Sequence, residues 1–319
     1  MIGNSFSPSL IKLIRSGSVY VAILFCHACT GVESSPPSVI PAMLSPDDLI
    51  TEGLPTQDSS LHPLWQQGSL VKGRVLPGSH VEFLGNEVYV NAQGEFLLGL
   101  GRDAPAKVAV LVTDASGIKH RHEYDVVQRK YNIQRVEGVE PKYVTPSAKD
   151  QQRIDLDNAM IGEARRLRDT RADFANGFIW PLVGPISGVY GSQRFYNGEG
   201  RQPHYGVDIV RPVGALVQSP AAGKVTFVRD MYYSGWTLVI DHGQGLSSSF
   251  LHLSNVLVKV GDIVKQGDSI AEVGATGRVT GAHLDWRMNW LDQRIDVQLL
   301  VPPMPVFNED PGKTPAATD

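Results

Sequence analysis

The stretch Gly281-Ala282-His283-Leu284-Asp285-Trp286 decides the fold class of the C-terminal part of the chain. Polar and apolar residues alternate in it, so in a strand His283 and Asp285 share one face while Leu284 points to the core. Short runs of this kind, separated by Gly-rich turns, fill residues 177–301 with almost no helical pattern. The pattern predicts a β-sheet domain with polar side chains on one sheet face.

Two further polar interruptions lie earlier in the same region. Residues 204–208 (HYGVD) place His204 and Asp208 four residues apart, and Gly206 allows a tight backbone path between them. Residues 249–253 (SFLHL) form an apolar run that His252 interrupts, and a buried imidazole there needs a partner. Convergence of the three segments on one sheet face would make a site, although spacing alone does not establish it.

The middle of the chain predicts a small β-sandwich over residues 61–135 and a connecting helix over residues 149–171. In the sandwich, His120 and His122 share a strand face, but no third ligand is near in sequence, so a metal-free pair is favoured. Near the end of the helix, three arginines suit the negative helix pole: Arg165, Arg166 and Arg168. A solvated helix face is favoured for them over a basic patch that binds an anionic polymer.

The two ends of the chain carry no predicted core. Residues 1–31 combine two basic residues, a short apolar run and small residues, the order of a secretory signal peptide. Ala28 before Cys29 also permits lipid attachment at Cys29, which would tether the protein to a membrane. A flexible linker is predicted over residues 32–60 and a disordered tail over residues 302–319. The prediction is an exported protein of the periplasm or cell envelope.

Composition narrows the classes of ligand. The 319 residues include 42% hydrophobic residues and carry a net charge of −4, which fits a soluble globular protein and makes nucleic acid an unfavourable partner. Both cysteines lie in the first thirty residues, so any metal elsewhere must be held by His, Asp or Glu. The sequence gives no indication of the oligomeric state.

Five separated motifs resemble the lysostaphin/LytM-type zinc peptidases, which cut peptide bridges in bacterial peptidoglycan. They are residues 203–208, 241–243, 250–253, 260–268 and 274–284, in the family's order and at similar separations. The resemblance implies an antiparallel β-domain with a groove on one sheet. It implies zinc held by His204, Asp208 and the residue two after His283. It also implies His252 as general base and His283 as donor to the oxyanion, and Tyr196 as a substrate-binding residue, whereas His242 matches no catalytic position.

The third ligand position departs from the family's usual H-L-H, because this chain has His283-Leu284-Asp285. An imidazole bound through its nearer nitrogen and a carboxylate place the donor atom equally far from Cα, and both bind zinc at ~2.0 to 2.2 Å. Asp285 can therefore fill the position. Two carboxylates in place of one predict a less acidic bound water, hence an alkaline activity optimum or greater tolerance of Mn²⁺.

The resemblance predicts an exported zinc endopeptidase that hydrolyses peptidoglycan cross-links by a metal-activated water. The bond is either a D-alanyl to diaminopimelate cross-link or a glycine bridge. The alternative is an inactive LytM-like domain that binds peptidoglycan or activates another hydrolase. Catalysis is favoured because His204, Asp208, His252 and His283 are all retained.

Overall fold

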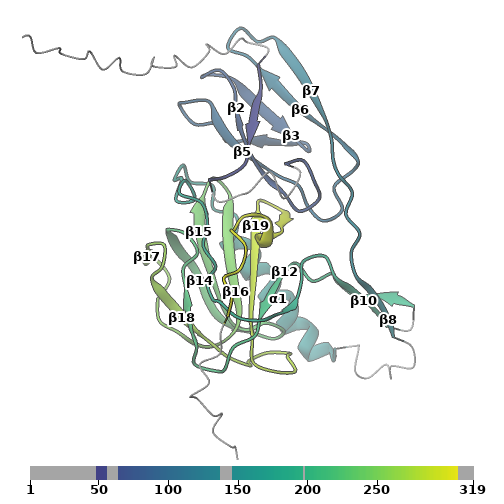
Figure 1. Cartoon of the computed structure of the whole chain (residues 1–319), viewed down its shortest axis with the longest axis vertical. Coiled ribbons are helices and arrows are strands. Elements are labelled where there is room, and N and C mark those ends of the chain that lie inside the picture. Colours follow the sequence, from purple (N-terminus) through teal and green to yellow (C-terminus); the bar gives the residue numbers. More distant parts are fainter. Residues whose placement is uncertain (1–47, 56–63, 137–145, 197, 308–319) are drawn as a thin grey trace, which may run out of the picture. The chain divides into compact units, whose positions relative to one another are not determined.

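The computed structural model describes residues 48–55, 64–136, 146–196 and 198–307 (Figure 1). The predicted signal peptide, most of the predicted linker and the end of the predicted tail lie outside these residues. Within them, the chain is mainly β with one α-helix and mostly antiparallel strands, which confirms the predicted fold class. No helix in this part of the chain is long and apolar enough to cross a membrane.

The N-terminal strands form two small antiparallel sheets. One has the order β1-β2-β5 and the other β4-β3-β6-β7. Their bounds are β1 (Ile50–Glu52), β2 (Leu70–Arg74), β3 (His80–Phe83), β4 (Asn86–Val88), β5 (Glu95–Gly99), β6 (Lys107–Thr113) and β7 (Lys119–Asp125). The alternation in β6 buries Val108, Val110 and Val112 on one face, as a half-buried strand requires.

A third small sheet joins two regions far apart in sequence. β8 (Ile133–Val136) pairs in parallel with β10 (Gln193–Tyr196), which pairs with β11 (Glu199–Gly200). The predicted sandwich range ends inside β8, but β8 pairs with a strand of the C-terminal region. Parallel pairing between distant segments leaves no local signal in the sequence.

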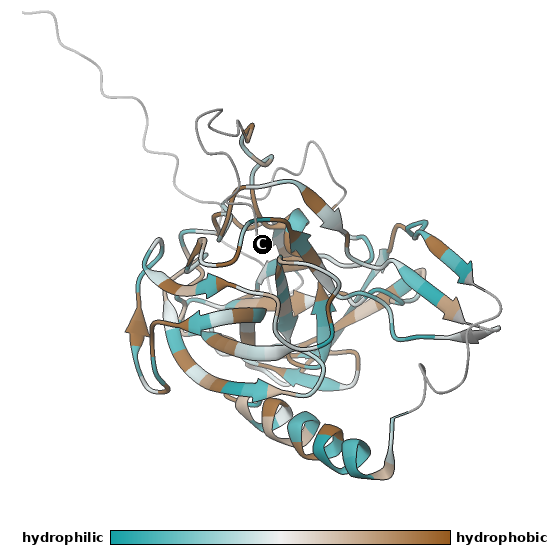
Figure 2. Cartoon of the chain, turned by 90° about the horizontal axis from the view of Figure 1, so that it is seen from below, coloured by the Kyte–Doolittle hydropathy of each residue, from teal (hydrophilic) through white to brown (hydrophobic). Residues whose placement is uncertain are grey.

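The C-terminal strands form one ten-stranded sheet with the main order β17-β14-β15-β16-β19-β12-β9. Their bounds are β9 (Ile186–Gly188), β12 (Gly206–Ile209), β13 (Leu216–Gln218), β14 (Gly223–Met231), β15 (Gly235–Gly243), β16 (Leu246–Val256), β17 (Ile263–Val264), β18 (Ser269–Val273), β19 (Leu284–Trp290) and β20 (Gln293–Ile295). A short 3-10 helix, η2 (Val297–Leu299), follows. Figure 2 shows apolar and polar residues alternating along several strands.

Helix α1 (Ala148–Ala164) packs on β14. Ser147 caps its start by accepting a hydrogen bond from the Asp150 amide at 3.2 Å, and Ile161 packs with Phe227 and Met231. The helix ends at Ala164, before the predicted residue 171, and the segment after it bonds to the C-terminal sheet instead: the Asp169 carbonyl accepts from the Gln244 amide at 2.9 Å.

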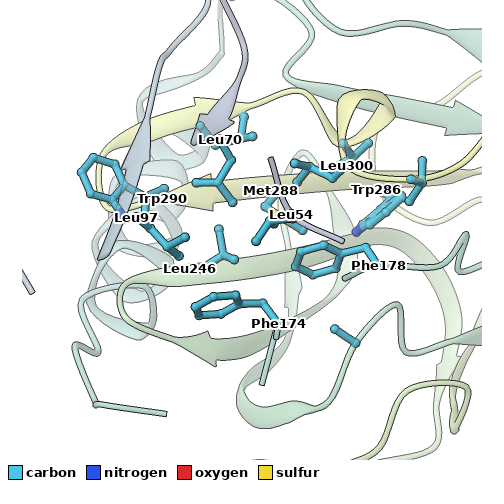
Figure 3. Packing of buried hydrophobic residues seen from close by; sticks show 14 of the residues in the cluster. Leu54, Leu70, Leu97, Phe174, Phe178, Leu246, Trp286, Met288, Trp290 and Leu300 are labelled. Atoms are coloured by element: carbon cyan, nitrogen blue, oxygen red, sulfur yellow. The ribbon is translucent and has the colours of Figure 1, made fainter. Parts of the chain in front are cut away.

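The buried face of β19 connects the sheets. Trp286, Met288 and Trp290 alternate on it and join a hydrophobic cluster that includes Leu70 and Leu97 of the N-terminal strands (Figure 3). Asp285, Arg287 and Asn289 alternate with them, so their side chains belong to the opposite face. The fold thereby presents one polar face of β19.

Candidate metal centre and active-site groove

Strand register brings the three predicted metal ligands together. Asp208 in β12 lies directly opposite Asp285 in β19, so the two side chains share a sheet face, and His204 stands just before β12. Ligand atoms of His204, Asp208 and Asp285 all lie within 4.8 Å of one another. Among the described residues, this is the one group of three with that property.

Two atoms of this group lack hydrogen bonds although they are buried. His204 Nε2 and Asp208 Oδ1 lie at ion-pair distance, 3.2 Å apart, but neither atom makes a hydrogen bond. His204 Nδ1 lies 4.0 Å from Asp285 Oδ2. Buried polar atoms are costly without a partner, and one imidazole with two carboxylates is a donor set that Zn²⁺ or Mn²⁺ accepts. The residues therefore fit a divalent cation.

The two predicted catalytic histidines stand beside this group. The rings of His252 and His283 lie 4.9 Å apart between centroids, and His283 Nε2 is 3.7 Å from Asp208 Oδ1. His252 Nδ1 contacts the Thr276 carbonyl at 2.9 Å, and His283 Nδ1 contacts the Gly281 carbonyl at 2.9 Å. Because a carbonyl only accepts, each Nδ1 carries the hydrogen and each Nε2 is left for chemistry.

Backbone strain marks His252. Its φ is +63°, a left-handed conformation that residues with a side chain seldom adopt. The register between β15 and β16 shifts beside it, because Trp236 pairs with Leu253 but Leu238 pairs with Phe250. Burial lowers the pKa of His252, against the hydrogen bond from Nδ1 to Thr276, so the neutral imidazole is favoured.

Arg287, which sequence reasoning missed, holds the third ligand. Its Nε lies 3.0 Å from both oxygens of Asp285, and its Nη2 lies 2.5 Å from Oδ2. Burial raises the pKa of Asp285, but the charges of Arg287 and His204, with the hydrogen bonds from Arg287, outweigh this and lower the pKa to about 2. The signal was present, since residues two apart in a strand share a face.

This ion pair removes the basis for the expected alkaline optimum. That expectation counted two uncompensated carboxylates, whereas Arg287 adds a positive charge beside Asp285. The pair Asp285 and Arg287 together has zero net charge, as a neutral imidazole has. The charge argument for an alkaline optimum therefore applies to a variant without Arg287, and for the wild-type protein the optimum stays an untested prediction.

Two cavities flank the candidate metal centre. One, of about 470 Å³, lies toward β8 and β10 and includes Arg194 and His204 in its lining. The other, of about 310 Å³, is lined by His252, by residues of α1 and by the 231–234 segment, which contains Tyr232 and Tyr233. Arg287 lines both cavities. The two cavities therefore adjoin at Arg287, beside the candidate metal centre.

The remaining predicted residues lie apart from the candidate metal centre. The backbone of Tyr196 lies in β10, and its side chain is outside the described part of the structure, so its predicted role is untested. His242 is fully buried, with Nδ1 2.6 Å from the Ala222 carbonyl and Nε2 2.8 Å from Ser248 Oγ. His120 Nε2 contacts Asp114 Oδ2 at 3.3 Å.

Residues 202–297 match the model of Peptidase family M23, which confirms the resemblance drawn from the motifs. Two curated relatives of Vibrio cholerae serotype O1 are the peptidoglycan DD-endopeptidases ShyB, 45% identical over 94 residues, and ShyA, 42% identical over 86 residues. The matches cover 30% and 27% of this chain and 22% and 20% of those proteins, so the chain spans about a fifth of their length.

A solved structure extends the likeness beyond the matched segment. The crystal structure of a protein from Pseudomonas aeruginosa, described as a peptidase M23, superimposes with a TM-score of 0.59 at 27% identity. The superposition covers 73% of this chain and 93% of that chain. Because 73% of the chain is a larger share than residues 202–297 make up, the fold shared with that protein includes elements outside the M23 segment.

Proposed function

We propose that this chain is an exported, metal-dependent endopeptidase that hydrolyses peptide cross-links of bacterial peptidoglycan. The observation that carries the proposal is the pair of buried atoms without hydrogen bonds, His204 Nε2 and Asp208 Oδ1, with Asp285 across the strand pair. The relatives' cell-wall activity, the M23 match and the predicted signal peptide of residues 1–31 support the same substrate and location.

His204, Asp208 and Asp285 would hold the cation, with zinc and manganese both compatible with the donor set. A divalent ion bound there supplies Lewis acidity toward the scissile carbonyl and the attacking water. His252, neutral and with Nε2 free, accepts the water proton in the protein's part of the reaction. His283 Nδ1 donates a hydrogen bond to the Gly281 carbonyl. Nε2 can therefore donate to an oxyanion only when the ring carries a hydrogen on both nitrogens.

One observation favours a second function, that of a domain which binds peptidoglycan without cutting it. Both oxygens of Asp285 are engaged by Arg287, so coordination of a cation competes with an existing ion pair. Such a domain would recognise the wall peptide through the same groove.

Elemental analysis of the purified mature protein, joined to a peptidoglycan digestion assay, decides between the two functions. We expect one equivalent of zinc or manganese in the wild type and its loss in Asp285→Ala. His252→Ala should keep the metal and lose turnover by at least about 100-fold, the scale of a general base. If the wild-type protein stays metal-free after loading with excess zinc or manganese, the proposed metal-dependent activity is contradicted. The peptidoglycan-binding function would then be the remaining proposal.

A further inference from the structure

A row of arginines continues from the candidate metal centre along the polar face of the sheet. Arg287 lies two residues beyond Asp285 in β19, which is about 7 Å along a strand. Ser249 of β16 is the cross-strand partner of Arg287, and Arg294 of β20 is the partner of Asn289. Arg165, from the end of α1, reaches the same row, because its Nη2 donates to Ser249 Oγ at 2.8 Å.

Two of these arginines have neutral partners only. Arg165 bonds Ser249, and its Nε is buried without a hydrogen bond. Arg294 Nη1 donates to Asn289 Oδ1 at 2.9 Å, and its guanidinium lies 5.6 Å from the ring centre of Tyr205. Among the described residues, no carboxylate lies within ion-pair distance of either side chain.

The acid that lines the cavity, Asp157, and the nearby Asp285 are both engaged by other groups. Asp285 is bound by Arg287. Asp157 accepts the Tyr232 amide at 2.8 Å and lies 3.8 Å from Arg153 and 3.7 Å from Arg229. The 310 Å³ cavity therefore gathers Arg165, Arg287 and Arg294 with a single compensating carboxylate among those three.

Such a cluster costs free energy in the free protein. Like charges repel more strongly away from water, and desolvation disfavours each charged form. Burial, followed by the charges of Arg294 and Arg287, lowers the pKa of Arg165 well below its usual value. Burial and the charge of Arg287 also lower the pKa of Arg294. Placement at the helix C-terminus explains a basic residue at position 165, but it does not require that the side chain lie half-buried, with its Nε buried, beside two other arginines.

We infer that Arg165 and Arg294 form a binding site for a carboxylate of the substrate peptide, placed beside the scissile amide in the cavity that His252 lines. Guanidinium groups recognise carboxylates with charge-assisted hydrogen bonds, and the anion would relieve the repulsion within the cluster. This inference rests on the proposed peptide-binding groove but not on its catalysis. It specifies an anionic cross-link, such as one through diaminopimelate with a free carboxylate, over a neutral glycine bridge.

The test uses synthetic cross-linked peptides in which a D-alanyl residue acylates diaminopimelate. One peptide has its carboxylates free, a second has the diaminopimelate carboxylate beside the scissile amide converted to an amide, and a third has only the glutamyl carboxylate amidated. Binding is measured by calorimetry on His252→Ala protein, so that it does not depend on turnover. We expect the free peptide to bind about 10- to 100-fold more tightly than the second peptide, the range of hydrogen bonds to a charged group.

Arg165→Gln and Arg294→Gln, each added to His252→Ala, should remove that preference and leave affinity for the second peptide unchanged. Arg166→Gln is the matched control, because Arg166 is at the same helix end but is exposed and paired with Glu163. Melting temperature and metal content verify that each variant is folded and loaded. A preference tied to the glutamyl carboxylate alone would move the site away from the scissile amide and overturn the inference.

Equal affinity for all three peptides, or a preference that survives both substitutions, would also overturn the inference. Absence of cleavage by loaded wild type would instead contradict the proposed activity, while the affinity difference still reports on the arginines. The two failures are therefore distinguishable.

Discussion

At the scale of single residues, Arg287 sets the charge of the candidate metal centre. Arg287→Gln keeps a hydrogen-bond donor near Asp285 but removes the positive charge, which leaves two carboxylates facing the cation. We expect divalent metal to bind at least about 10-fold more tightly, since a unit charge a few ångströms from a 2+ ion is worth several kcal/mol even at an effective dielectric constant of ~20. Competition with a chromogenic chelator measures the affinity.

The same substitution has an opposite effect without metal. The Asp285 side chain is 2% exposed, and a buried charge that loses its partner typically costs ~3 to 5 kcal/mol. Chemical unfolding of metal-free Arg287→Gln should show a loss of that order, and added zinc should recover it. Weaker metal binding by the variant would mean that Arg287 acts chiefly by orienting Asp285, and the charge argument would fail.

At the scale of the element, the end of β15 contains a buried histidine, His242, in its neutral form. Burial lowers the pKa of His242 to about 4, against the hydrogen bond to Ala222, from an ordinary value of 6.5. Between pH 4 and pH 6.5 the unfolded chain binds a proton at His242 that the folded chain does not bind. The free energy of unfolding is therefore unaffected by His242 above pH 6.5, and it decreases by up to ~3 kcal/mol as the pH falls toward 4. The adjacent Asp241 has the opposite pH dependence, because burial raises its pKa to about 6 in the folded chain. Its contribution to the free energy of unfolding therefore increases as the pH falls below 6.

NMR of the histidine ring nitrogens separates these contributions. We expect His242 to remain neutral, with hydrogen on Nδ1, at pH 5 in the folded protein, because the Ala222 carbonyl accepts from Nδ1. The same residue in urea should titrate near pH ~6.5. A folded-state titration at that ordinary value would show that the ring is solvated, contrary to the packing.

Sequence patterns predicted single strands better than they predicted which distant segments lie together in the fold. The alternation of Val108, Val110 and Val112 predicted a half-buried strand because strand burial has a local period of two. The family resemblance likewise implied the candidate ligands, which strand register brings together. Convergence of Arg165 and Arg294 was not predictable, since it depends on where α1 ends and on which strand β20 pairs with.

At the scale of the whole molecule, the strand that carries Asp285 ends in the core shared with the N-terminal sheets. Trp290 lies 6.4 Å from Phe83 between ring centres, and it packs against Gly99 of β5. A Cβ added at Gly99 would lie 2.7 Å from Trp290 Cε3 and 3.0 Å from Ile295 Cδ1, closer than packed carbon atoms tolerate. The N-terminal sheets therefore pack against the C-terminal end of β19, the strand that carries Asp285.

Gly99→Ala tests this coupling. We expect a loss of ~1 to 3 kcal/mol from overpacking, in a single unfolding transition followed by tryptophan fluorescence and by far-ultraviolet circular dichroism. Gly162→Ala in α1 is the matched control, because its added Cβ meets no atom within 4 Å beyond its chain neighbours and the adjacent helix backbone. It should stabilise by ~0.5 to 1 kcal/mol through helix propensity. If Gly99→Ala were neutral, or if the two probes gave separate transitions, the N-terminal sheets would be an independent module and the conformation of β19 would not depend on them.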